Sequence, residues 1–214
     1  MFSEFYKKDA HYSRYYALFM VGFGTGLRIG ELLALTWDDI DYSNKVIHIR
    51  KTIVYLPMDG GMKFKVQTPK TRKSVRDIPL LENIEKILRR QFMGQKKKIM
   101  RMGDRWTPLE EEGFSNLIFT TEYGTPIDRN MITRTLHQII NKMNQSGISI
   151  EQFSPHAMRH SFATRCFERG VPAKVVQEVL GYSSLNMTMD LYTHVINDTK
   201  QNEMEKINCI FKAE

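Results

Sequence analysis

Cysteine is scarce in this sequence. Only Cys166 and Cys209 occur among the 214 residues, and they form no CxxC pair. A zinc ribbon or a disulfide framework would need more cysteines at closer spacing. We therefore interpret both as small helix residues of a protein that works in a reducing compartment.

Long hydrophobic runs are also missing, since no apolar stretch approaches the roughly 20 residues that cross a bilayer. The first residues lack the charged-then-apolar plan of a secretory signal. A G-x-x-x-x-G-K-[ST] loop, which would cradle the phosphates of a nucleotide, does not occur. We therefore expect a cytoplasmic protein with no membrane span and with no nucleotide or other cofactor.

Basic residues, by contrast, are in excess and give the chain a formal net charge of +7. Two runs carry much of this charge. The first contains no acid and consists of Lys63, Lys65, Lys70, Arg72, Lys73 and Arg76. The second is opposed only by Asp104 and consists of Lys86, Arg89, Arg90, Lys96, Lys97, Lys98, Arg101 and Arg105. Such runs indicate a polyanionic partner such as nucleic acid, although a solvated surface would have the same composition.

Helical periodicity and helix-start signals dominate the chain. We predict helices at residues 12–23, 27–35, 81–102, 128–144, 154–169, 172–180, 183–192 and 197–210. The helix at 81–102 is expected to be interrupted or to end near Gly94, and Asp128 and Ser154 are expected to cap the helices that follow them. Strands are predicted at residues 46–49, 61–68 and 74–79. The expected fold is one mainly α domain with a small three-stranded antiparallel sheet.

Two arginines stand at the starts of predicted helices. Arg28 lies one turn before Glu31, whose carboxylate could hold its guanidinium in place. Arg159 follows His156 by three residues, so both share a face near the amino end of one helix, where phosphate is favoured. Two such guanidinium groups could clamp a phosphodiester and neutralise the charge of a pentacoordinate transition state. Ordinary surface pairs would contain the same residues, so each pattern alone is weak.

Three segments together resemble the tyrosine recombinase, or phage integrase, family. The family pattern T-G-L-R-x-x-E-L-x-x-L is matched at residues 25–35, and H-x-L-R-H-[ST]-F-A-T is matched at 156–164 with Met158 in the leucine position. The ending L-G-H-S-S…T-x-x-x-Y-x-H is matched at 180–194, except that Tyr182 stands where the family usually has histidine. The matches cover nearly the whole chain in the correct order, so the resemblance implies the catalytic-domain fold of that family.

The resemblance also implies roles for the basic residues. Arg28 and Arg159 would hold the scissile phosphate, and His156 would assist by a hydrogen bond or a proton transfer. Lys70 matches the hairpin lysine that protonates the departing 5′-oxygen, with Lys73 close enough to be its alternative.

Tyr192 matches the family's nucleophile. A free phenol has a pKa near ~10, so cations and a basic neighbour would have to help it lose its proton at neutral pH. Its attack would form a 3′-phosphotyrosyl bond and free a 5′-hydroxyl, which would reverse the step on the same or a partner duplex. One phosphodiester-type bond replaces another, so no metal or ATP is required. Tyr182 is a rival nucleophile, and as a phenol it could donate a hydrogen bond to phosphate but could not become a cation near pH 7.

The function implied by the resemblance is that of a site-specific DNA recombinase or integrase of a mobile element. Its partners would be double-stranded DNA and further copies of the chain, assembled as a tetramer on DNA. Residues 1–214 would be the catalytic domain. Family members usually carry an amino-terminal DNA-clamping domain, and Arg28 comes too early in this chain for one to fit.

Two other classes of protein remain as alternatives. A metal-dependent nuclease would need several carboxylates around its cations, and the cluster of Asp38, Asp39 and Asp41 is the only tempting one. These residues precede a predicted strand, where turns and caps are the ordinary use of aspartate. A non-catalytic DNA-binding module descended from a recombinase is favoured only by Tyr182.

Overall fold

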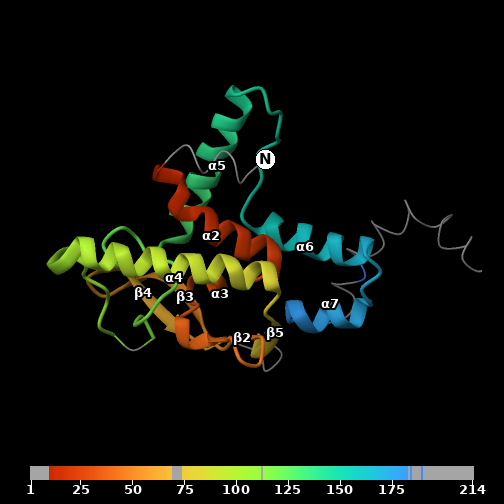
Figure 1. The fold of residues 1–214 in the computed structure, drawn as a ribbon, viewed down its shortest axis with the longest axis horizontal. Coiled ribbons are helices and arrows are strands. Elements are labelled where there is room, and N and C mark those ends of the chain that lie inside the picture. The colour runs from red at the N-terminus through yellow and green to blue at the C-terminus, as the bar shows by residue number, and fades with distance from the viewer. Residues whose placement is uncertain (1–9, 69–73, 112, 183, 185–188, 190–214) are drawn as a thin grey trace, which may run out of the picture.

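A computed structural model describes residues 10–68, 74–111, 113–182, 184 and 189 (Figure 1). Its helices are α2 (Ala10–Thr25), α3 (Ile29–Leu33), α4 (Glu82–Met102), α5 (Arg129–Gln145), α6 (His156–Glu168) and α7 (Ala173–Leu180). Its strands are β1 (Ile40–Asp41), β2 (Val46–Ile49), β3 (Thr52–Met58), β4 (Gly61–Gln67) and β5 (Arg76–Pro79). The mainly α architecture with a small antiparallel sheet was predicted correctly.

The hydrophobic core is built around α2, which packs against both α4 and α6. Leu18 and Phe19 of α2 are fully buried in it. Helix α5 contributes Ile132, Leu136 and Ile139, which recur at helical spacing and face the same cluster. No helix in the described part of the chain is both long and apolar enough to cross a membrane.

The main sheet has the strand order β1-β2-β5 and is antiparallel throughout. Ile47 of β2 pairs with Ile78 of β5, and both are buried in the core. Because side chains alternate between the two faces of a strand, Arg76 lies on the same buried face as Ile78. The sheet therefore places the guanidinium of Arg76 in the interior.

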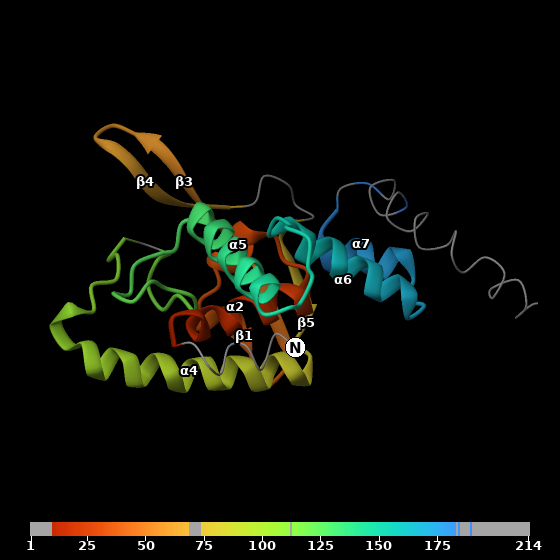
Figure 2. The same cartoon turned by 90° about the horizontal axis from the view of Figure 1, so that it is seen from above.

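The predicted membership of this sheet was wrong for one strand. The strand predicted at 61–68 corresponds to β4, which pairs with β3 in a separate two-stranded hairpin. Figure 2 shows this hairpin projecting from the body, at the edge opposite α4. Strand β3 was missed because most of its side chains beyond Val54 are exposed and Pro57 interrupts its pattern. The turn at Gly60 and Gly61, both at positive φ, was the available signal.

Three local expectations about the helices are corrected. Helix α4 continues through Gly94, which has open space around it and so no steric reason to end the helix. Asp128 occupies the N-cap position of α5, but its side chain makes no capping hydrogen bond. At the start of α6 no side chain makes a capping hydrogen bond, so the expected cap by the Ser154 hydroxyl is absent. The backbone carbonyl of Ser154 instead accepts a hydrogen bond from Ala157 N at 2.9 Å. The helices predicted at 183–192 and 197–210 lie outside the described residues.

Candidate active site

Arg159 is the most deeply buried charged residue among those described, with 1% of its surface exposed. Its Nη1 donates to Gly26 O at 2.9 Å and its Nη2 to Leu180 O at 2.7 Å. Its Nε donates to the hydroxyl of Tyr182 at 3.2 Å, and the guanidinium carbon lies 4.3 Å from the centre of the Tyr182 ring. Burial lowers the pKa of the guanidinium from its very high ordinary value, yet an arginine stays charged in proteins.

Arg28 precedes α3 in an extended conformation and is more accessible, with 39% of its side chain exposed. Its Nη1 donates to Glu31 Oε1 at 2.9 Å, and its backbone N–H donates to Glu31 Oε2 at 3.0 Å. Its Nη2 donates to Gly181 O at 3.2 Å. The expected hold of Glu31 on Arg28 is therefore present.

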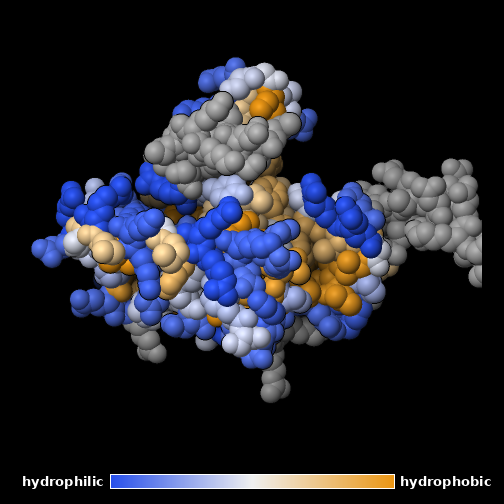
Figure 3. Space-filling view, viewed as in Figure 1, coloured by the Kyte–Doolittle hydropathy of each residue, from blue (hydrophilic) through white to orange (hydrophobic). Residues whose placement is uncertain are grey.

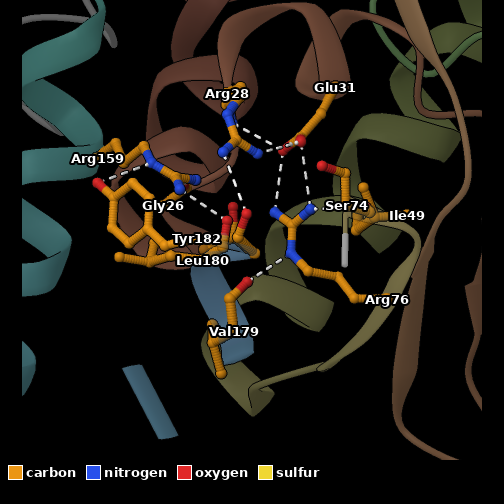
Figure 4. A network of polar contacts seen from close by, with 12 residues as sticks. Gly26, Arg28, Glu31, Ile49, Ser74, Arg76, Arg159, Val179, Leu180 and Tyr182 are labelled. Carbon is orange, nitrogen blue, oxygen red and sulfur yellow. Dashed lines mark hydrogen bonds and ion pairs between the residues drawn. The ribbon is translucent and has the colours of Figure 1, made fainter. Parts of the chain in front are cut away.

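These bonds fasten the three matched segments to one another (Figure 4). Arg28 of the first segment holds Gly181 of the third, while Arg159 of the second holds both Gly26 of the first and Leu180 of the third. Gly26 has φ +63°, and a Cβ there would lie 2.6 Å from a ring carbon of Phe162 and 2.7 Å from a methyl carbon of Leu180. The glycine thus permits both the left-handed turn and the close contact of this turn with Phe162 of α6 and Leu180 of α7.

Arg76 completes the network, and its role was not predicted from the sequence. It is 9% exposed, and its Nη1 and Nη2 donate to Glu31 Oε1 and Oε2 at 3.2 and 2.9 Å. Burial alone would raise the pKa of Glu31, but the hydrogen bonds and charge of Arg76, followed by those of Arg28, hold it below its ordinary value. The signal that could have identified Arg76 was its alternation with Ile78, because residues two apart in a strand share a face.

His156 stands at the start of α6 beside a cleft of about 470 Å³ that Arg28 and Arg129 also line. Its ring meets that of His160 edge-on, with the centroids 4.7 Å apart. Partial burial, followed by the charges of His160 and of the nearby arginines, lowers the pKa of His156. A neutral imidazole at pH 7 can accept a proton or donate a hydrogen bond through its one N–H.

The remaining predicted residues divide into two groups. Tyr182 is brought into the site, where it is 6% exposed and packed on Arg159. Lys70, its alternative Lys73, and Tyr192 lie outside the described residues.

Two of the three aspartates considered for a metal site accept hydrogen bonds from neighbouring residues of a cap and a turn. Asp39 Oδ2 accepts hydrogen bonds from Thr36 N at 2.8 Å and from Thr36 Oγ1 at 2.7 Å. Asp41 Oδ1 accepts from the backbone N–H groups of Ser43 and Asn44, both at 2.9 Å. The interpretation of these two residues as turn and cap residues is confirmed.

Known proteins resemble the chain over nearly its whole length. It is 38% identical over 200 residues to the tyrosine recombinase XerC-like protein of Caldanaerobacter subterraneus subsp. tengcongensis, a match of 91% of this chain and 49% of the relative. It is 28% identical to the transposase from transposon Tn916 of Enterococcus faecalis, over 95% of this chain and 48% of the relative. The chain therefore spans about half the length of these curated relatives.

A solved structure gives the same result for the fold. The Tn1549 transposon integrase in complex with transposon right end DNA superposes with a TM-score of 0.81 at 30% identity, covering 97% of this chain and 63% of that one. The family model described as "Phage integrase family" matches residues 2–198, which include all three segments of the site. The chain belongs to the phage integrase family.

Proposed function

We propose that this chain is the catalytic domain of a site-specific DNA recombinase of a mobile element. The observation that carries the proposal is the fastening of residues 26–28, 159 and 180–182 into one site by two guanidinium groups. Relatives named as a tyrosine recombinase and a transposon transposase support the same activity. The partner would be double-stranded DNA, as in the solved complex of the Tn1549 integrase, and the working assembly would be a tetramer on DNA.

The phosphate would meet Arg28 first. This guanidinium is partly exposed and lines the cleft next to His156. Arg159 uses three of its five N–H groups inside the protein, which leaves one on each terminal nitrogen for a phosphate oxygen. Because Arg159 is buried, we expect residues 180–182 to shift when DNA binds, since catalytic contacts often tighten only in the complex.

The chemistry would be a metal-free transesterification. The Tyr192 oxygen forms a bond to phosphorus, and the bond from phosphorus to the 5′-oxygen breaks, with Lys70 giving that oxygen its proton. The two arginines neutralise the charge that builds on the non-bridging oxygens. Neutral His156 would accept the proton that the Tyr192 phenol loses, or donate a hydrogen bond to a non-bridging oxygen. The 5′-hydroxyl then attacks the phosphotyrosyl bond and reseals the strand.

Tyr182 would donate a hydrogen bond instead of attacking. Its hydroxyl oxygen already accepts a bond from Arg159, and its ring is packed on the same guanidinium. A phenol keeps one proton to donate, so the hydroxyl could reach a phosphate oxygen while Arg159 stays oriented. Its burial makes it a poor nucleophile for a bulky duplex.

Covalent trapping tests this function. A labelled duplex from the ends of the mobile element that encodes the protein would be nicked, so that a small 5′-hydroxyl fragment diffuses away after cleavage. We expect an SDS-resistant adduct in EDTA from the wild type and from Tyr182→Phe, which keeps the ring over Arg159, but none from Tyr192→Phe. An adduct that persists in Tyr192→Phe and is lost in Tyr182→Phe would reassign the nucleophile. Absence of any adduct from the wild type would contradict the proposal and favour a protein that only binds DNA.

A further inference from the structure

Arg76 uses every nitrogen of its guanidinium inside the protein. Its Nε donates to Val179 O at 2.6 Å, and its Nη1 reaches Ser74 O at 3.1 Å in addition to Glu31. The side chain is 7% exposed, and four of its five N–H groups are already engaged by the protein. Whatever Arg76 contributes to the reaction must therefore act through its neighbours.

The carboxylate of Glu31 is shared evenly between two arginines. Its Oε1 accepts from Nη1 of Arg28 at 2.9 Å and from Nη1 of Arg76 at 3.2 Å. Its Oε2 accepts from the backbone N–H of Arg28 at 3.0 Å and from Nη2 of Arg76 at 2.9 Å. Because each oxygen is held from both sides, the carboxylate has a single orientation, and Arg28 is aligned on it (Figure 4).

The second support of Arg28 also depends on Arg76. Arg28 Nη2 donates to Gly181 O, which lies two residues beyond the carbonyl of Val179 that Arg76 holds. Helix α7 ends between these two carbonyls, at Leu180. Arg76, the first residue of β5, thus holds Glu31 directly and the carboxyl end of α7 next to Gly181. These are the two places where the Arg28 guanidinium finds its acceptors.

We propose that Arg76 is a positioning residue that fixes the Arg28 guanidinium toward the scissile phosphate, through Glu31 and the carboxyl end of α7. This inference rests on the proposed recombinase function. Stability alone does not require such an arrangement, because a buried ion pair is often no better than well-packed apolar side chains. Orientation does require it, because a planar fork can hold both carboxylate oxygens, whereas an apolar side chain holds neither.

The test compares three variants of the full chain. Arg76→Met removes the fork at similar length, and Arg76→Lys keeps a charge without the fork. Arg89→Met is the matched control, because Arg89 also pairs with a glutamate, Glu85 of the same helix α4, and has 59% of its side chain exposed. If Arg76→Met does not fold, Arg76→Lys carries the test, since it leaves Glu31 with a cation.

The first measurement is independent of catalysis. In ¹⁵N-labelled protein, the order parameter of the Arg28 Nε–H bond reports how firmly its guanidinium is held. We expect it to fall in Arg76→Met and in Arg76→Lys, and to be unchanged in Arg89→Met. An Arg28 signal that stays equally ordered in folded Arg76 variants would overturn the proposal, even if the wild type formed no adduct with DNA.

The second measurement uses the trapping duplex with either a phosphate or a neutral methylphosphonate at the cleavage position. We expect the rate of adduct formation by the Arg76 variants to fall about 100-fold on the phosphate, as misplaced catalytic groups do. The fall should be much smaller on the methylphosphonate, which has less charge for Arg28 to neutralise. Equal losses on both substrates would indicate a merely structural role and would also overturn the proposal. Failure of the wild type on both would count against the recombinase function instead.

Discussion

Ion pairs between a basic residue and glutamate occur both in the buried site and on the exposed surface of α4. Only the buried pair fixes the orientation of a neighbouring side chain. In the interior, Glu31 is 4% exposed and is held by the guanidinium groups of Arg28 and Arg76 and by the backbone N–H of Arg28. On α4, Lys86 and Glu82 form an i,i+4 pair with 63% and 79% of their side chains exposed. Figure 3 shows a largely hydrophilic surface in the region where α4 crosses the view. Water screens the second pair and competes for it.

Both glutamates have a lowered pKa, but for different reasons. In Glu31 burial is the largest influence and raises the pKa, and the two arginines overcome it. In Glu82 the hydrogen bond from Lys86 is the largest influence, and there is almost no burial to oppose. The same direction of pKa shift therefore marks both an ion pair that the fold depends on and one that the fold can lose.

The largest expected effect follows from removing the interior carboxylate. Glu31→Ala leaves the guanidinium of Arg76 buried without a counter-ion, which costs about 3–5 kcal/mol in comparable buried pairs. Urea denaturation should show this loss of stability directly. Glu82→Ala is the matched control and should leave the denaturation midpoint unchanged. Equal effects of the two substitutions would show that the buried and the exposed glutamate contribute equally to stability.

Acid should weaken the interior pair in a defined direction. The pKa of Glu31 is lower in the folded protein than its ordinary value of 4.5. Its contribution to stability is therefore fully present above that ordinary value and is lost as the pH falls through the lowered folded one. The stability of Glu31→Ala should depend less on pH across this window than that of the wild type.

A smaller effect is expected from two glycines that differ in backbone conformation and in surroundings. Gly26→Ala would place a Cβ against Phe162 and Leu180 at a positive φ, and overpacking of this kind costs about 1–3 kcal/mol. Gly94→Ala lies in the middle of α4 with nothing within 4 Å, so it should stabilise the protein by roughly 0.5–1 kcal/mol. In thermal denaturation, the melting temperature should fall for Gly26→Ala and rise for Gly94→Ala, if the turn at Gly26 is as tight as the structure indicates. A Gly26→Ala variant with the same melting temperature as the wild type would contradict this expectation.

Local signals explain which parts of this molecule could be predicted. Helical periodicity predicted most helices, because the residues of such a pattern lie within one or two turns of each other. The pairing of Arg28 with Glu31 is equally local, at a separation of three residues. The bonds from Arg159 to Gly26 and from Arg76 to Glu31 join residues 133 and 45 positions apart, and no spacing rule specifies such contacts. The pairing of β3 with β4 escaped prediction because exposed side chains leave no alternating pattern.

The smallest expected effect is on the pKa of His156, which lies beside the buried arginines and lines the open cleft. Its pKa is lowered by partial burial first, then by His160, and then by nearby arginines that include Arg159 and Arg28. Well above its ordinary pKa of 6.5, the ring is neutral whether the chain is folded or unfolded. As the pH falls through that value the unfolded chain takes up the proton first, so the folded state loses a small amount of stability until its own lower pKa is passed. A ¹H–¹³C titration of the ring should place the midpoint below that of a free histidine.

Two changes should move that midpoint upward. His160→Gln removes the charge of the neighbouring ring and should raise the pKa of His156 slightly, whereas Glu82→Ala on α4 should not change it. A bound duplex should raise it further, because a phosphate close to the ring favours the charged imidazolium. A midpoint that changes with neither His160→Gln nor DNA would mean that neither the His160 ring nor a bound phosphate acts on His156. The cleft beside Arg28 would then be no part of the phosphate site, since a phosphate held there by Arg28 would lie next to this imidazole.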